Sequence, residues 1–188
     1  MIRSLLAFAF RRFGRRYDYD PAYMIEIADA NAMAGLKLAI AASLLSHDFD
    51  VPKPVYFAAK ARSARRADCG PCLRLILSLA AEQGVPAGQL LPVFDSGATS
   101  PDAPSALDTA LAIAFADAVV DDSPALLEIS DQVERRFGKQ GRIGLATAVV
   151  AGQFFPLYKR ALGHAAACEP VMAELLAQIR ATDTGHAT

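Results

Sequence analysis

Two cysteines separated by only two residues stand out in this chain of 188 residues, in the segment Cys69-Gly70-Pro71-Cys72. In the first turn of a helix, residues three apart lie on one face with Cα atoms about 5–6 Å apart, which suits a disulfide bond. Backbone N–H groups without partners and the positive end of the helix dipole stabilise a thiolate there. We therefore predict that Cys69 and Cys72 form a catalytic dithiol pair, with at least one thiol pKa below the free value of about 8.5.

Basic and aromatic side chains precede the pair on a predicted helix. Arg65 and Arg66 are the nearest cations, and we predict that they stabilise the thiolate or bind substrate. Lys60 and Tyr56 are further candidates for the same roles. The simpler interpretation places Lys60 and Arg62 on a solvated face and Tyr56 in the core, and it is the one that we favour for these three.

A metal site is the weaker interpretation of the two thiols. Zinc requires a second set of ligands at matching spacing. The chain offers only scattered candidates, which are His47, His164, Cys168 and His186. We take the lone Cys168 as structural, and we expect neither a metal nor an organic cofactor.

The apolar pattern predicts an all-α protein of about seven or eight helices, because no segment shows the strict alternation of a strand. Asp20-Pro21 and Ser123-Pro124 combine an N-cap residue with a proline at the first helical position, and Gly138 is a stop. We expect Pro156 to kink or divide its helix. The predicted helices cover residues 20–45, 54–67, 69–84, 107–118, 123–138, 141–163 and 169–182.

The length and these elements fit one domain over residues 1–188. Residues 85–104 hold four prolines and two glycines and are predicted to be an internal linker. Residues 1–19 are an N-terminal extension whose helix packs Leu5, Leu6, Phe8 and Phe13 on a neighbouring element or subunit. Residues 184–188 are a frayed tail.

Composition limits the partners. The formal net charge is −1, so neither nucleic acid nor a membrane surface is an expected partner. Hydrophobic residues make up 53% of the chain, which suits a large core or a homo-oligomer that covers apolar faces. Three cysteines and an apolar N-terminal stretch too short for a signal peptide indicate a reducing compartment, the cytoplasm.

The tetrapeptide is that of thioredoxin, whose motif follows a buried strand, but here a charged helix precedes it, so we exclude the thioredoxin fold. The order of helices and the later segment "FGKQGRIGLATAVVAGQFFPLYKRALG" resemble the AhpD-like superfamily over residues 20–168. That superfamily contains alkylhydroperoxidase D and carboxymuconolactone decarboxylase. The resemblance implies an AhpD-like all-α fold assembled as a dimer, trimer or hexamer.

The same resemblance implies a thiol-dependent oxidoreductase that reduces a peroxide or a disulfide and is restored by a dithiol electron donor. Cys72 would match the peroxide-attacking cysteine, and Cys69 the resolving one. Redox members of the family carry a Glu and a His that relay the proton, and their positions here hold Phe57 and Ile76. Two alternatives remain open: a cofactor-free lyase like carboxymuconolactone decarboxylase, with His164 as its candidate base, and a non-catalytic oligomeric helical protein.

Overall fold

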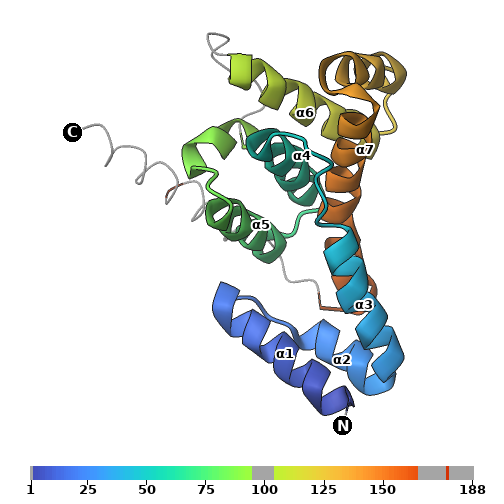
Figure 1. Ribbon diagram of the computed structural model, residues 1–188. Coiled ribbons are helices and arrows are strands. Elements are labelled where there is room, and N and C mark those ends of the chain that lie inside the picture. Colours follow the sequence, from blue (N-terminus) through green and yellow to red (C-terminus); the bar gives the residue numbers. More distant parts are fainter. Residues whose placement is uncertain (1, 95–103, 165–176, 178–188) are drawn as a thin grey trace, which may run out of the picture.

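The protein is all-α, as the sequence predicts. The computed structural model describes residues 2–94, 104–164 and 177, and within these ranges the chain forms helices joined by turns, with no strand (Figure 1). The helices are α1 (Ile2–Tyr17), α2 (Ala22–Ala30), α3 (Ala32–Leu44), α4 (Lys53–Arg66), α5 (Gly70–Glu82), the 3-10 helix η1 (Ala87–Val93), α6 (Pro104–Val120) and α7 (Leu126–Ala161). The helix predicted from Glu169 lies outside the described residues.

Helix α4 is the central element of the fold. It packs against α5, α6, α7 and η1, and in Figure 1 it lies among them. Its side chains are buried around most of its circumference, and Phe57 is 2% exposed. Alanines at 58, 59, 61 and 64 are each 0% exposed, which lets the neighbouring helices approach closely.

The closest approach is the crossing of α4 and α7 at Gly152. A Cβ atom on Gly152 would lie 2.5 Å from the carbonyl oxygen of Lys60, so no side chain fits there. Two hydrogen bonds join the helices beside it: the Ser63 hydroxyl donates to the Val149 carbonyl at 2.7 Å, and the Gln153 amide donates to the Ser63 carbonyl at 2.7 Å. The crossing therefore fixes the position of α4 around Lys60.

A buried ion pair joins α4 to α6 and η1. Arg62 is 8% exposed, and its guanidinium donates to both carboxylate oxygens of Asp117, at 2.7 and 2.9 Å. A third N–H donates to the Val93 carbonyl at 3.0 Å. The interpretation of Arg62 as part of a solvated face is wrong, because α4 is enclosed on nearly all sides and its paired guanidinium is enclosed with it.

The single helix predicted over residues 20–45 is two helices. The side-chain oxygen of Asn31 accepts hydrogen bonds from the backbone N–H groups of Met33 and Ala34, at 2.9 and 3.1 Å, so Asn31 ends one helix and caps the next. The break lets α3 fold back on α2, where a Cβ atom on Gly35 would lie 2.7 Å from that of Ala28. The sequence analysis did not identify this cap because Asn31 lies within a mostly apolar segment.

The predicted linker is partly helical. Residues 87–93 form η1, whose Leu90 and Val93 side chains are 1% and 0% exposed. Residues 95–103 lie outside the described part of the chain. Within α7, Gly138 has φ 73° and is where the helix breaks, in agreement with the predicted stop. It is the one residue inside α7 with non-helical dihedrals, so the helix passes Pro156 undivided.

Helix α1 covers most of the predicted N-terminal extension, residues 1–19. It packs on α2 and α3, with Leu6 and Phe10 buried and Phe13 partly buried. The predicted Leu5 and Phe8 contacts are absent within the described chain, since these side chains are 67% and 57% exposed. None of the helices in the described ranges combines the length and apolar character that crossing a bilayer requires.

We predict that Gly152→Ala destabilises the protein by about 1–3 kcal/mol, because the new Cβ meets backbone atoms that cannot rotate away. Urea unfolding measures the change. The control is Gln140→Ala on an exposed part of the same helix, which should alter the free energy of unfolding by less than about 0.5 kcal/mol. Equal effects of the two substitutions would show that the close crossing is not what holds α4 and α7 together.

Candidate functional site

The two cysteines lie at the start of α5. Cys69 is the N-cap residue, with φ −123° and ψ 89°, and Cys72 is in the first turn. Their Cα atoms are 5.3 Å apart and their sulfur atoms lie at disulfide-bonding distance. The spacing therefore brings the sulfurs together as predicted.

The two sulfurs differ in their surroundings. Cys72 is 4% exposed and belongs to an apolar cluster that α1 and α2 form with the residues between them. Cys69 packs at the edge of the same cluster and is only partly buried. Cys69 is thus the cysteine that a second molecule reaches more easily.

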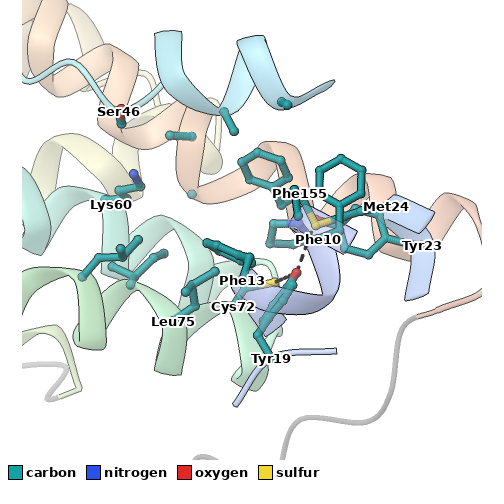
Figure 2. Close-up of a pocket in the computed structure, with 18 residues that line it drawn as sticks. Phe10, Phe13, Tyr19, Tyr23, Met24, Ser46, Lys60, Cys72, Leu75 and Phe155 are labelled. Atoms are coloured by element: carbon teal, nitrogen blue, oxygen red, sulfur yellow. Dashed lines mark hydrogen bonds between the residues drawn. The ribbon is translucent and has the colours of Figure 1, made fainter. Parts of the chain in front are cut away.

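Cys72 faces a pocket of about 420 Å³. Residues from α1, α2, α3, α4, α5 and α7 line it, so every helix except α6 and η1 contributes (Figure 2). Its main apolar side chains are Phe10, Phe13, Met24, Leu75, Ile76 and Phe155. The size and apolar character suit a small organic molecule.

The Tyr19 hydroxyl lies beside Cys72, and the Tyr23 hydroxyl lies beside that of Tyr19. The Tyr19 oxygen is 4.0 Å from the Cys72 sulfur and 3.4 Å from the Tyr23 oxygen, and Figure 2 marks the contact with the sulfur. Burial raises the pKa of Tyr19 to about 12 and raises the pKa of Tyr23 further. Both phenols therefore remain protonated at neutral pH and are available as hydrogen-bond donors.

A buried cation lies against the two tyrosine rings. Lys159 of α7 is 5% exposed, and its Nζ lies 4.8 Å from the ring centroid of Tyr19 and 5.8 Å from that of Tyr23. These are cation–π distances. The ammonium group therefore adds positive charge close to the residues that surround Cys72.

Lys60 is a second lysine at the site, and it lines the pocket itself. Burial lowers its pKa to about 8. Its Nζ lies 5.5 Å from the ring centroid of Tyr56, and it has no carboxylate partner among the described residues. Lys60 is therefore only partly exposed to solvent and lies on the wall of the pocket, where Figure 2 labels it.

Tyr56 is a core residue, as the simpler interpretation had it. Its ring is 2% exposed, its hydroxyl donates to the Leu45 carbonyl at 3.1 Å, and burial raises its pKa to about 12. The hydroxyl is thus held at the end of α3. At the site, the residue contributes the ring beneath Lys60.

The two arginines before the cysteines make contacts with η1 and α6. Arg65 donates to the Val93 carbonyl at 2.6 Å and lies over the Phe94 ring. Arg66 forms an ion pair with Asp121 and lies 3.8 Å from Asp117. These contacts hold the end of α4, and a role for either arginine at the thiolate stays a prediction.

Apolar side chains occupy the two positions at which the AhpD-like resemblance would place a proton relay. Phe57 is part of the core around α4, and Ile76 lines the pocket one turn after Cys72. Neither side chain can carry a proton. Any group that assists Cys72 therefore comes from elsewhere in the chain, and Tyr19 is the nearest polar side chain with a contact to its sulfur.

The scattered histidines do not gather around the thiols. His164 pairs with Glu26 and packs near the Tyr23 ring, whereas His47 stacks edge-on against Phe49. In residues 2–94 and 104–164, no three His, Cys, Asp or Glu side chains are grouped as metal ligands. Cys168 and His186 lie outside the described residues.

Sequence reasoning missed Tyr19, Tyr23 and Lys159. The signal for the tyrosines was weak: Tyr19 precedes the predicted helix start and Tyr23 lies in the first turn after it, so no helical spacing relates them. Lys159 gave a weaker signal as a cation at the end of an apolar helix. Nothing in the sequence linked these residues to cysteines about fifty or more positions away.

Comparison with known proteins identified no similar protein. No family model, no curated protein and no solved structure matches the chain. The chemistry of the site therefore rests on its own residues.

We predict that Lys60→Met stabilises the protein at pH 7. The folded state lowers the pKa of this ammonium, so the charged form of Lys60 reduces the free energy of unfolding. This loss of stability is complete below pH 8 and fades as the pH rises from about 8 toward 10.5. The gain should be about 2–3 kcal/mol at pH 7 and less than about 1 kcal/mol at pH 10 in urea unfolding. Lys37→Met, on the exposed side of α3, is the control and should show no such dependence. A loss of stability in Lys60→Met at pH 7 would contradict the prediction.

Proposed function

We propose that the protein is a thiol-dependent peroxidase that reduces organic hydroperoxides with Cys72 and Cys69. One observation carries the proposal: Cys72 is buried against an apolar pocket, while its partner Cys69 lies partly exposed at the N-cap of α5. An attacking thiol needs contact with the substrate, and a resolving thiol needs access to the reductant. The two sulfurs meet these needs separately.

The reaction has three steps. The Cys72 thiolate attacks the distal oxygen of the hydroperoxide, the O–O bond breaks, and a proton converts the leaving alkoxide to an alcohol, which leaves Cys72 as a sulfenic acid. The Cys69 thiol then displaces water from this sulfenic acid and forms the Cys69–Cys72 disulfide. An external dithiol reduces the disulfide and is itself oxidised to a disulfide.

Tyr19 assists the first step. Its hydroxyl, kept protonated by burial, donates to the Tyr23 oxygen in the structure; when it turns its proton to the Cys72 sulfur 4.0 Å away, it favours the thiolate over the thiol. Lys159, over the same ring, adds a positive charge that acts in the same direction. These groups take the place of the relay that Phe57 and Ile76 cannot supply.

We further propose that the domain has an AhpD-like fold and acts as a homo-oligomer in a reducing compartment such as the cytoplasm. The order of helices supports the fold, since a buried α4 precedes the CxxC helix and α7 carries the second-half pattern. Exposed apolar side chains support the oligomer: Met33, Ile40 and Leu44 of α3, and Ile143, Val150 and Leu157 of α7. Each set recurs along one helix, which suits a covered face.

Counting thiols tests the peroxidase. Treatment of the reduced chain with tert-butyl hydroperoxide should remove two of its three thiols, because Cys69 and Cys72 form a disulfide. In Cys69→Ser the reaction should stop at a sulfenic acid on Cys72, which dimedone labels, and in Cys72→Ser no thiol should be lost. Cys168→Ser is the matched control and should react like the parent chain at the pair. Thiols that stay free in the parent chain would overturn the proposal.

Replacing Tyr19 tests its assistance. We predict that Tyr19→Phe slows the reaction of Cys72 with hydroperoxide about threefold to tenfold, the equivalent of one hydrogen bond of about 0.5–1.5 kcal/mol. Stopped-flow measurement of thiol loss gives the rate. Tyr158→Phe, on the exposed part of α7, is the control and should leave the rate unchanged. An unchanged rate in Tyr19→Phe with an unchanged melting temperature would remove Tyr19 from the mechanism.

A further inference from the structure

The pocket beside Cys72 contains one feature that the thiol chemistry does not use, the ammonium group of Lys60. Lys60 and the Ser46 hydroxyl line one side of the pocket, and Figure 2 shows them well apart from Tyr19 and Tyr23. Between these polar ends the lining is apolar, with Leu75, Ile76 and Phe155 among its side chains. The pocket thus has one cationic end and an apolar body.

The charge of Lys60 is uncompensated within the described protein. Arg62, two residues later on α4, is neutralised by Asp117, whereas Lys60 has an aromatic ring beside it and no carboxylate. A cation in an apolar setting is costly unless an anion pairs with it. An anionic ligand in the pocket would supply that partner.

We propose that the pocket binds an apolar monocarboxylate, with its carboxylate on the Lys60 ammonium and its hydrocarbon part extending toward Cys72. One ammonium matches one negative charge, so a singly charged head group suits the site better than a phosphate dianion. The apolar lining between Lys60 and Cys72 disfavours ligands that carry polar groups along the middle of the chain. The charge of the head and the apolar character of the body together define the ligand.

The size of the pocket sets the length of the ligand. A space of about 420 Å³ holds roughly fourteen groups of the size of a water molecule, at about 30 Å³ each. A carboxylate on a chain of about ten carbons fills this space. If the proposed peroxidase is correct, on which this last step rests, the substrates are hydroperoxides of such acids, anchored at Lys60 with the O–O bond at Cys72.

Calorimetric titration of the full chain with decanoate and with 1-decanol tests the binding. Decanoate should bind with one site per chain and at least tenfold more tightly than decanol. Lys60→Met, which we expect to be more stable than the parent chain, should lose this preference. Lys37→Met should keep it. Absence of decanoate binding, or a preference that survives in Lys60→Met, would overturn the inference.

Alkylation locates the ligand. In the double variant Cys69→Ser/Cys168→Ser, Cys72 is the one remaining cysteine. Decanoate should slow the reaction of this cysteine with iodoacetamide at least fivefold. When the same chain also carries Lys60→Met, decanoate should give no protection. If decanoate does not protect Cys72 in the chain that retains Lys60, the proposed position of the ligand is refuted. Oxidation by tert-butyl hydroperoxide needs no carboxylate, so loss of thiols without decanoate binding refutes this inference alone. Decanoate binding without thiol oxidation refutes the peroxidase alone.

Discussion

The crossing of α4 and α7 at Gly152 is the constraint on which the rest of the structure depends. With no side chain at that point, the backbone of α4 from Lys60 to Ala64 lies directly against α7, and the Ser63 hydrogen bonds hold it there. On another side of α4, Arg62 faces α6 and η1, where the ion pair with Asp117 and a hydrogen bond to the Val93 carbonyl satisfy it. Lys60, at the crossing itself, lines the pocket.

The cysteines lie where two apolar clusters meet. One cluster surrounds α4, and the other is formed by α1, α2 and α3 and includes Cys72. Side chains at such a boundary are buried yet border on space that neither cluster fills, and the pocket occupies that space. Burial keeps the tyrosines protonated and the lysine charge poorly solvated, so the same position that shelters Cys72 also determines the chemistry of its neighbours.

Local signals predicted what depends on neighbouring residues in the chain. Asp20-Pro21, Gly138 and the spacing of Cys69 and Cys72 each act within one helical turn, and the structure has a helix start, a break and a sulfur pair there. The burial of Arg62 and the position of Lys60 at a pocket could not be predicted, since α4 is enclosed almost completely and its sequence still looks like a charged surface helix. The Asn31 cap was overlooked because its flanks are uniformly apolar.

The first helix of the chain has a consequence for how the protein could diversify. Helix α1 supplies Phe10 and Phe13 to the pocket, yet the core around α4 contains none of its residues. Some residues that shape the ligand space therefore lie outside the core that holds α4, although Ile76 belongs to both. Phe10 is buried in the cluster that contains Cys72, whereas Phe13 only borders it, so substitutions at Phe13 can alter which molecule the pocket accepts with the least effect on the surroundings of the thiols.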